Sequence, residues 1–335
     1  MRLLIFGTTK EEQQRILTLN ETVALEKVDF AEGIFTRDRV KEVQGYDGIW
    51  IMTNSSIGEP EAKVLKEAGV RYIISRATGI DHLDIKALEK YGLKAANVPS
   101  YSPNAISEHT ILMLLSALRK MKRNQNMIAR RDFGIQGICG REVRMMTVGV
   151  IGSGRIGSLT IQALKGLGAE VLVNAPVVNP AIEEIATYVS LDELLEKSDA
   201  ILLHCPLTEE NYQIISRESL EKCKDGVVLV NTARGGLVDA KSILEALKTG
   251  KVSSFAMDVY EGEDDFVRMD FHGKAMEDSV LEELLNREDV IYTAHVGFLT
   301  DQALYEIMRI SLENAAEYEK KGCCQNEVTC RGEGK

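Results

Sequence analysis

The chain has 335 residues, of which 44% are hydrophobic and 27% are charged, an ordinary balance for a globular protein. This length suits about two domains and allows a full hydrophobic core without metals or disulfides. The formal net charge is −11 and no basic block is present, which argues against nucleic acid as the main partner because phosphate binding needs clustered lysine and arginine. A small-molecule partner is favoured instead.

The apolar runs are too short to predict a membrane segment or a secretion signal. MRLLIFGTTK has a brief apolar core before the charged KEEQQR, and ILMLLSAL at 111–118 falls well short of a span. The six cysteines lack a regular spacing, and the terminal GCCQNEVTC has no nearby histidine or usual ligand spacing. We therefore expect reduced thiols, no metal site and a cytoplasmic protein.

Strand-like and helical patterns alternate along the whole chain, which is typical of βαβ units, a mainly parallel sheet and the α/β class. In the first hundred residues the strand-like runs are LLIFG, YDGIWIM, RYIISRA and KAANV. Between them, the helical pattern EPEAKVLKEAG ends in glycine, a common stop signal. These runs predict a first open sheet.

After Pro99 and Pro103, the segment NAISEHTILMLLSALRKMKRN predicts one long helix, buried on most of its surface and packed between two units. From Thr147 a second open sheet is predicted by TVGVIG, EVLVNA, AILLHCP, GVVLVNTA, SFAMDVY and DVIYTAHVG. The stretch 261–279 is irregular and predicts a loop. The last helical pattern, TDQALYEIMRISLENAAEYEKKG, should return to the first sheet.

The stretch VGVIGSGRIG places Gly152, Gly154 and Gly157 between a strand-like run and a helical one. Such glycines permit a tight turn, close approach to a pyrophosphate and helix–strand contact, so the pattern predicts a dinucleotide site. About 20 residues on, where an acidic residue usually binds the NAD ribose, stand Asn174 and Ala175. Without a carboxylate to repel a 2′-phosphate or a nearby cation to attract one, NAD and NADP both stay open.

Candidate catalytic side chains follow strands of the second series, at the edge where open α/β sheets bind ligands. Arg234 has a planar guanidinium that can clasp a carboxylate in two parallel bonds. His295 ends the last strand and is the best candidate for a general acid, and a carboxylate such as Glu263 would favour its imidazolium form. The other histidines lie in connections of the first sheet, in the irregular loop or beside a proline: His82, His109, His272 and His204.

The ordered motifs GSGRIG, HCPLTEEN, NTARGGLVD, AMDVYEGE and TAHVGF resemble the D-isomer-specific 2-hydroxyacid dehydrogenases over essentially the whole chain. VPSYSPNAISEHT and DVYEGE resemble the D-lactate dehydrogenase branch of that family. The resemblance implies two Rossmann-like open parallel-sheet domains, a flavodoxin-like substrate domain of residues 1–101 and 298–335 and an inserted NAD(P)-binding domain of residues 102–297. It also implies an active cleft between the domains and a homodimer built through the cofactor domain and its long preceding helix.

The positions of this chain that match the family motifs imply roles for individual residues. Arg234 would bind the substrate carboxylate and polarise its carbonyl, His295 would exchange the proton, and Glu263 would pair with that histidine. Thr78 and Gly79 would offer backbone N–H groups to the substrate. Tyr101 and Met52 would line the substrate pocket. Cofactor contacts would come from Gly152, Gly154, Arg155, Ile156, Gly157, Ala175, Cys205, Pro206, Asn211, Thr232, Ala233 and Asp258.

Two positions depart from the family pattern. Its NAD-selecting aspartate falls on Ala175, and the arginine that 2-hydroxyglutarate enzymes place in the segment matching IWIMTN is replaced by Met52 and Thr53. A second substrate carboxylate would be unpaired there, so pyruvate or a larger apolar 2-keto acid is favoured. We therefore expect an enzyme that reduces a 2-keto acid to the D-2-hydroxy acid with NADH, NADP being left open.

Two alternatives differ in class or in substrate. The first is a non-catalytic NADH-sensing module, as in related transcriptional corepressors that keep the same three residues. The second is a phosphoglycerate or glycerate dehydrogenase, which the D-lactate-type motifs disfavour.

Overall fold

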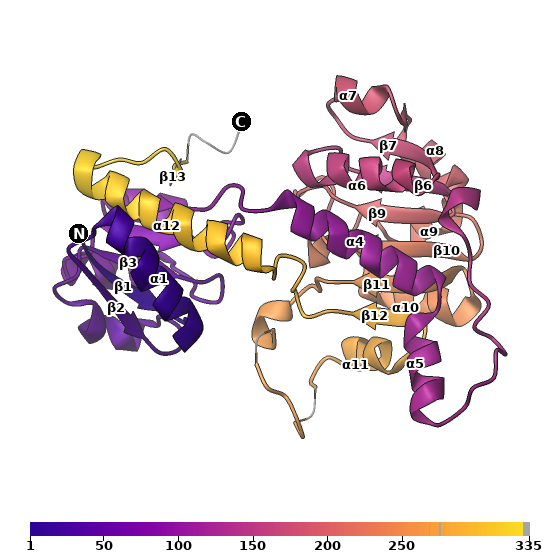
Figure 1. The fold of residues 1–335 in the computed structure, drawn as a ribbon, viewed down its shortest axis with the longest axis horizontal. Coiled ribbons are helices and arrows are strands. Elements are labelled where there is room, and N and C mark those ends of the chain that lie inside the picture. Colours follow the sequence, from indigo (N-terminus) through magenta and orange to yellow (C-terminus); the bar gives the residue numbers. More distant parts are fainter. Residues whose placement is uncertain (268, 275, 331–335) are drawn as a thin grey trace. The chain divides into compact units, whose positions relative to one another are not determined.

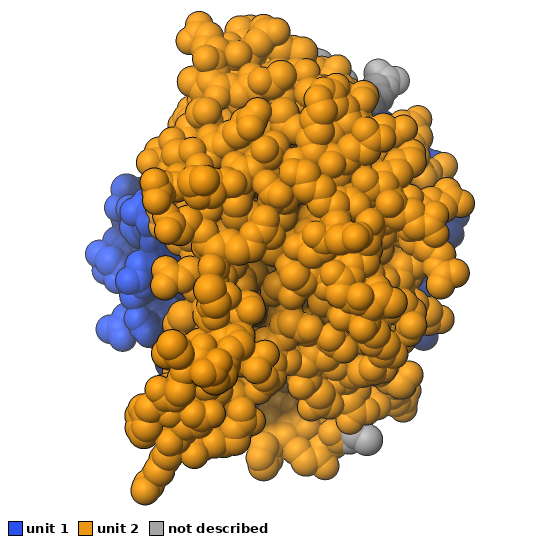
Figure 2. All heavy atoms as spheres, turned by 90° about the vertical axis from the view of Figure 1, so that its right-hand side faces the viewer, with its two compact units in different colours: residues 1–102, 300–335 blue, residues 103–299 orange. Residues whose placement is uncertain are grey.

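The computed structural model describes residues 1–267, 269–274 and 276–330, and the chain divides into two compact units. Unit 1 comprises Met1–Ser102 and Thr300–Lys335, and unit 2 comprises Pro103–Leu299 (Figure 2). The domain boundaries expected from the sequence, 101/102 and 297/298, lie within two residues of these divisions. Among the described residues, every helix is too short or too polar to cross a membrane.

Unit 1 is built on a six-stranded sheet of order β13-β5-β4-β3-β1-β2. Figure 1 labels β1, β2 and β3 of this sheet. Its strands are parallel except for the last: β1 (Arg2–Phe6), β2 (Lys27–Ala31), β3 (Gly48–Ile51), β4 (Tyr72–Ser75), β5 (Lys94–Ala96) and the antiparallel β13 (Glu327–Val328). The four predicted strands are β1, β3, β4 and β5. Two strands were not predicted: β2 is a half-exposed edge strand, and β13 has only two residues.

The core of unit 1 follows from the alternation of side chains along a strand. In β1, Leu4 and Phe6 belong to one buried cluster, whereas Leu3 and Ile5 belong to another. The second cluster contains Met308 of the last helix, which confirms the predicted return to the first sheet. The helices of this unit are α1 (Lys10–Val23), η1 (Arg37–Val43), α2 (Glu59–Glu67), α3 (Ile85–Lys90) and α12 (Asp301–Lys321).

Unit 2 has a seven-stranded parallel sheet of order β12-β11-β10-β9-β6-β7-β8. Its strands are β6 (Thr147–Ile151), β7 (Glu170–Asn174), β8 (Thr187–Tyr188), β9 (Ala200–Leu203), β10 (Val227–Asn231), β11 (Val252–Met257) and β12 (Val290–Tyr292). All six predicted strands are present, and the two-residue β8 was missed. The strand order reverses between β6 and β9, which is where open α/β sheets bind ligands.

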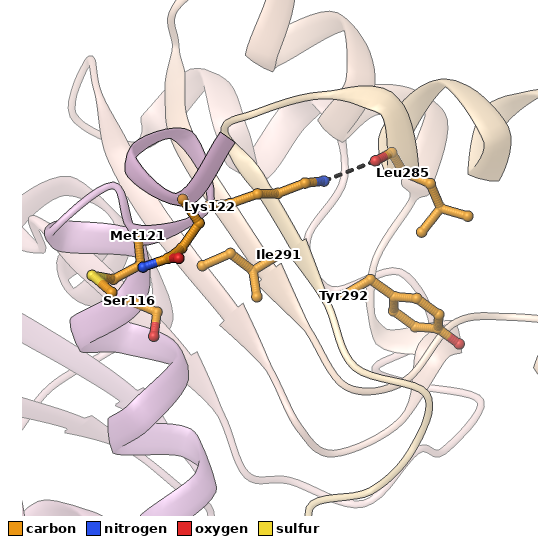
Figure 3. Close-up of a pocket in the computed structure, with 7 residues that line it drawn as sticks. Ser116, Met121, Lys122, Leu285, Ile291 and Tyr292 are labelled. Carbon is orange, nitrogen blue, oxygen red and sulfur yellow. Dashed lines mark hydrogen bonds between the residues drawn. The ribbon is translucent and has the colours of Figure 1, made fainter. Parts of the chain in front are cut away.

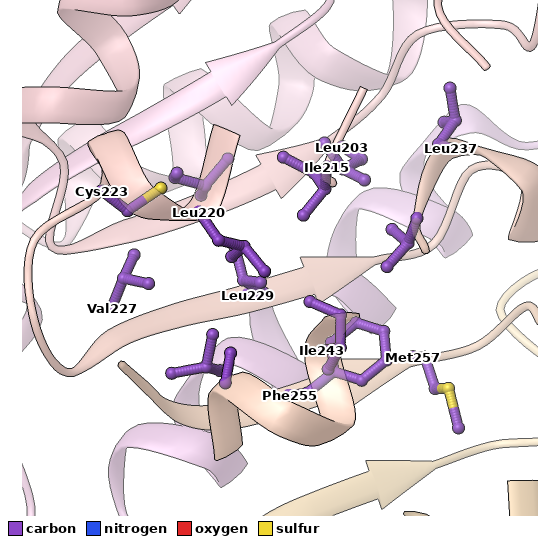
Figure 4. Close-up of a cluster of buried hydrophobic side chains, with 14 of the residues drawn as sticks. Leu203, Ile215, Leu220, Cys223, Val227, Leu229, Leu237, Ile243, Phe255 and Met257 are labelled. Atoms are coloured by element: carbon purple, nitrogen blue, oxygen red, sulfur yellow. The ribbon is translucent and has the colours of Figure 1, made fainter. Parts of the chain in front are cut away.

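Two buried clusters cover the faces of this sheet. Leu203, Leu229 and Phe255 pack with the helices of one face (Figure 4), and Val150 and Met113 belong to the cluster of the other face. The helices are α4 (Pro103–Leu118), α5 (Met121–Ala129), η2 (Val143–Met145), α6 (Arg155–Gly166), α7 (Pro180–Glu183), α8 (Leu191–Lys197), α9 (Arg217–Lys222), η3 (Gly235–Leu237), α10 (Ala240–Thr249), η4 (Glu263–Asp265) and α11 (Ser279–Asn286).

The prediction of one long helix after Pro103 was wrong. The helix α4 ends at Leu118, Lys120 has a left-handed φ of 51°, and α5 begins at Met121. As expected, most of α4 is buried or half-buried, although Leu112 is 59% exposed.

Candidate active site

The carboxyl ends of the unit 2 strands carry most of the predicted site residues. Gly152 follows β6, Cys205 follows β9, Arg234 follows β10, Asp258 follows β11 and His295 follows β12. Because all these strands are parallel, their carboxyl ends meet at the same edge of the sheet. Residues separated by more than a hundred positions in the sequence are thereby gathered at one edge.

The histidine and the glutamate expected to work together are in direct contact. His295 Nδ1 lies 2.6 Å from Glu263 Oε1, and the backbone N–H of Tyr260 donates to Glu263 Oε2 at 2.7 Å. The glutamate side chain is only 14% exposed, whereas the histidine side chain is 37% exposed. Since Nδ1 is engaged by the carboxylate, Nε2 is the nitrogen available to exchange a proton with a ligand.

The backbone of His295 adopts a left-handed φ of 54°, which is uncommon for a residue with a side chain. Its N–H donates to the carbonyls of Thr293 and Asp258, both at 2.8 Å. The next two N–H groups, of Val296 and Gly297, each donate to the Asp258 carboxylate at 2.9 Å. Such strained conformations persist where surrounding contacts hold them, and they concentrate at functional sites.

The Asp258 carboxylate is itself held by a buried polar cluster. Asp258 is 2% exposed, and the Thr293 hydroxyl donates to it at 2.6 Å. His109 Nε2 lies 3.3 Å from Asp258 Oδ1 and 3.0 Å from Thr293 Oγ1. Burial alone would raise the pKa of the Asp258 carboxyl, but hydrogen bonds from His109, Thr293 and two backbone amides bring that pKa below its ordinary value.

The predicted position of His109 was wrong, and no role was predicted for this residue. It lies on α4 in unit 2 rather than in a connection of the first sheet, and α4 brings it to the loop that carries His295. Asp258 was expected only to contact the cofactor, yet its carboxylate anchors this loop. A histidine on an apolar helix carries no local signal of a partner so distant in the sequence.

Arg234 lies in a loop that is folded by a neighbouring asparagine. Asn231 donates from Nδ2 to the Arg234 carbonyl at 2.9 Å and accepts from the Ala233 N–H at 3.0 Å. At Gly235, a Cβ would collide with the peptide group that joins Tyr260 to the following residue. The loop of Arg234 therefore packs backbone to backbone against the loop that leads to Glu263.

The glycine turn has the shape that a dinucleotide requires. Gly152 has a φ of 103° and donates its N–H to the Asn174 carbonyl at 2.8 Å, and a Cβ there would lie 2.6 Å from the His204 carbonyl. A Cβ at Gly157 would collide with the carbonyl of Gly152, whereas a Cβ at Gly154 would meet nothing within 4 Å. Gly154 also precedes α6 without a side-chain cap, so the helix N–H groups fit a pyrophosphate.

The remaining cofactor candidates lie at the same edge. Asn211 folds the loop after β9, since it donates to the Pro206 carbonyl and accepts from the Thr208 N–H, both at 2.7 Å. Thr232 is buried, and its hydroxyl lies 2.7 Å from that of Thr110 on α4. Arg155 and Ile156 begin α6, Ala175 follows β7, Cys205 follows β9 and Ala233 precedes the candidate arginine.

The family model described as D-isomer specific 2-hydroxyacid dehydrogenase, NAD binding domain, matches residues 111–297, more than half of the chain. The chain belongs to the D-isomer specific 2-hydroxyacid dehydrogenases. This finding confirms the family expected from the sequence motifs, and it confirms NAD as a cofactor of the dehydrogenase.

The dehydrogenase is similar to family members over almost its full length. Aromatic 2-oxoacid reductase from Clostridium sporogenes is 35% identical over 332 residues, which cover 99% of this chain and 100% of the relative. D-2-hydroxyacid dehydrogenase (NAD(+)) from Clostridioides difficile is 38% identical over 331 residues, which cover 98% and 100%. The crystal structure of a D-lactate dehydrogenase from Treponema pallidum matches with a TM-score of 0.89 at 33% identity, covering 98% and 100%. The predicted enzyme class and α/β fold are confirmed, and the non-catalytic alternative is not favoured.

The predicted substrate residues belong to unit 1 of the dehydrogenase. The Thr78 hydroxyl donates to the Val98 carbonyl at 2.9 Å, so the loop after β4 that also contains Gly79 is anchored by its side chain. Met52 follows β3 and is half-buried, with its Sδ 3.1 Å from the position that a Cβ on Gly7 would take. Tyr101 is half-buried near the end of the first segment. Their contact with substrate stays a prediction.

A buried ion pair at the base of the Thr78 loop was missed from the sequence. Arg76 follows β4, is 8% exposed, and lies with its Nη2 2.7 Å from Glu12 Oε1. Burial would raise the pKa of Glu12, but the charge of Arg76 and hydrogen bonds from Arg76 and Thr9 bring it below its ordinary value. The sequence signal was an arginine directly after a run of buried apolar residues.

Two further histidines, His82 and His204, have rings whose burial favours the neutral form. His82 Nε2 lies 2.9 Å from the Ser75 hydroxyl, and burial lowers the pKa of His82 to about 4. Burial also lowers the pKa of His204 to about 4. Both rings are therefore neutral near pH 7, which leaves His295 as the better placed of the three to act as an acid.

Proposed function

We propose that this dehydrogenase reduces pyruvate or a larger apolar 2-keto acid to the D-2-hydroxy acid, with His295 as the proton donor and Arg234 as the carboxylate-binding residue. The observation that carries this proposal is the 2.6 Å contact between His295 and Glu263 on a loop held in a strained conformation. A positioned imidazole–carboxylate pair is the arrangement expected of a general acid.

Each group at the site has one task in this reaction. The glycine turn of Gly152, Gly154 and Gly157 would hold NADH, which would supply a hydride for the carbonyl carbon. His295 holds the proton on Nε2 and transfers it to the carbonyl oxygen, while Glu263 stabilises the imidazolium before transfer and keeps its Nδ1 protonated. Arg234 can bind the substrate carboxylate through two parallel hydrogen bonds.

An apolar substrate side chain suits the residues of unit 1. Met52 stands after β3, where a second carboxylate would need a cation, and a flexible thioether adapts to apolar groups of different size. Arg76 is engaged by Glu12 in a buried ion pair. Two relatives of the chain are an aromatic 2-oxoacid reductase and a D-lactate dehydrogenase, which supports a range of substrates from pyruvate to larger apolar 2-keto acids.

Replacing His295 by glutamine tests the proposal. We expect turnover with pyruvate, 2-ketoisocaproate or phenylpyruvate to fall at least ~100-fold, because proton transfer is lost, while the Kd for NADH stays unchanged. His272→Gln is the matched control, since His272 is exposed in the 261–279 loop, and it should keep the wild-type rate. A near-normal rate in His295→Gln would remove this residue from the mechanism. Failure of the wild type to oxidise NADH with any of these acids would favour a non-catalytic module.

We further propose that unit 2 is the cofactor domain, that unit 1 is the substrate domain, and that the enzyme is a cytoplasmic homodimer. The dimer proposal is supported by apolar side chains exposed on α4, α5 and the following loop, which are Leu112, Ile128, Phe133 and Ile135 at 59%, 43%, 77% and 78% exposure. A hollow of about 320 Å³ borders the same helices and is lined partly by Met121 and Ile291 (Figure 3).

Light scattering on the purified chain tests the dimer. We expect twice the chain mass for the wild type and a single chain mass for the double variant Phe133→Ser with Ile135→Ser, because the loss of buried apolar area weakens association. A wild-type protein of single chain mass at micromolar concentration would refute the dimer.

A further inference from the structure

The end of β7, beside the glycine turn, is uncharged. The segment 174–181 reads NAPVVNPA and contains no acidic or basic residue. The Gly152 N–H donates to the Asn174 carbonyl at 2.8 Å, so Ala175 directly follows a residue bonded to the turn. In this fold the adenosine ribose of the cofactor is bound at that strand end.

A network of neutral side chains links the glycine turn to the segment that follows Ala175. The Tyr188 hydroxyl donates to Ser153 Oγ at 2.9 Å and accepts from the Asn179 N–H at 3.0 Å. Asn179 Nδ2 donates to Ser158 Oγ at 3.2 Å, and this hydroxyl donates to the Ser153 carbonyl at 2.9 Å. The described groups of this network are hydroxyls and amides. The backbone around the ribose subsite is therefore held by groups that carry no formal charge.

A carboxylate at this strand end acts differently on the two nicotinamide cofactors. It accepts hydrogen bonds from the 2′-hydroxyl of NADH, and it repels the 2′-phosphate of NADPH. The methyl group of Ala175 does neither. The nearby N-terminus of α6 carries the partial positive charge of a helix, which does not oppose a phosphate.

We infer that the dehydrogenase binds NADPH as well as NADH, with Kd values within about tenfold of each other, and that Ala175 is the residue responsible for this tolerance. The inference rests on the proposed cofactor site at the glycine turn. It extends the NAD dependence of the family to a second cofactor in this chain.

Equilibrium titrations of the full chain with NADH and with NADPH, followed by calorimetry, test the inference. In Ala175→Asp we expect the ratio of the NADPH Kd to the NADH Kd to rise at least ~30-fold, because a charged hydrogen bond to the 2′-hydroxyl is gained and repulsion of the phosphate is added. Ala175→Asn has nearly the same size without the charge, so its ratio should stay within about threefold of the wild type. Half-exposed Ala175 allows both substitutions without disturbing the core.

The outcomes separate the inference from the proposed function. Wild-type NADPH binding more than ~10-fold weaker than NADH binding would overturn the inference, as would an unchanged ratio in Ala175→Asp. In either case, reduction of 2-keto acids with NADH would leave the proposed function standing. Absence of binding by both nucleotides would overturn the cofactor site itself. Competition by 2′,5′-ADP and by 5′-AMP at similar concentrations would support the inference, because the two probes differ only in the 2′-phosphate.

Discussion

Gly297→Ala should damage catalysis through the buried carboxylate that holds the His295 loop. A Cβ at Gly297 would lie 2.9 Å from Asp258 Oδ2 and 3.3 Å from His109 Cδ2, so the carboxylate must shift. That oxygen also accepts the Gly297 N–H, and Oδ1 accepts the Val296 N–H and the Thr293 hydroxyl. Overpacking of this kind costs roughly 1–3 kcal/mol of unfolding free energy.

The effect on turnover follows from the position of the imidazole. The Asp258 carboxylate fixes the two backbone amides that follow His295, and a displacement of about 1 Å at a reacting group can lower the rate ~100-fold. We expect kcat with a 2-keto acid to fall by about that factor. The Kd for NADH should stay closer to the wild-type value, because the glycine turn lies on a different loop.

Steady-state kinetics, NADH titration and urea unfolding measure these effects. Gly166→Ala is the matched control in the same unit, because a Cβ at this last residue of α6 would meet nothing within 4 Å. It should keep the wild-type kcat and gain up to about 1 kcal/mol of stability. Wild-type kcat and stability in Gly297→Ala would refute the reasoning, since they would show that the carboxylate moves without consequence for the loop.

Other substitutions test the cofactor turn, the buried ion pair and the acid limit of stability. Gly154→Val should change the unfolding free energy of the cofactor-free protein by less than ~0.5 kcal/mol, because its Cβ enters open space. The same substitution should raise the Kd for NADH at least ~10-fold in a titration, and an unchanged Kd would exclude this turn as the pyrophosphate site. Arg76→Met should destabilise unit 1 by roughly 3–5 kcal/mol in urea unfolding by leaving Glu12 buried without its cation, and adding Glu12→Gln should recover part of the loss; no recovery would contradict the pairing. His82 has a pKa lowered from 6.5 to about 4, so its contribution to stability is complete above pH 6.5 and is lost as the pH falls toward 4. In His82→Asn the melting temperature should therefore depend less on pH between 6.5 and 4. An unchanged pH dependence would show that His82 is not the residue that causes it.

Much of the fold was predictable because its signals are local. Runs of buried valine and isoleucine mark β6 and β10, and glycines spaced along a strand–helix junction mark the cofactor turn. These patterns depend on backbone conformation and burial over a few residues. The edge strand β2 and the two-residue β8 were missed, because a short or half-exposed strand produces no clear alternation.

The sequence by itself determined two parallel α/β sheets, a nucleotide-binding turn and the catalytic candidates His295, Glu263 and Arg234. Only the tertiary structure decided that His109 meets Asp258, that their cluster holds the His295 loop at positive φ, and that the helix after Pro103 breaks at Lys120. The physical reason is that periodicity and glycine spacing act along the chain, whereas buried polar pairs form across it. Which side chains pair depends on the order of the strands and on the face of α4 that packs against them.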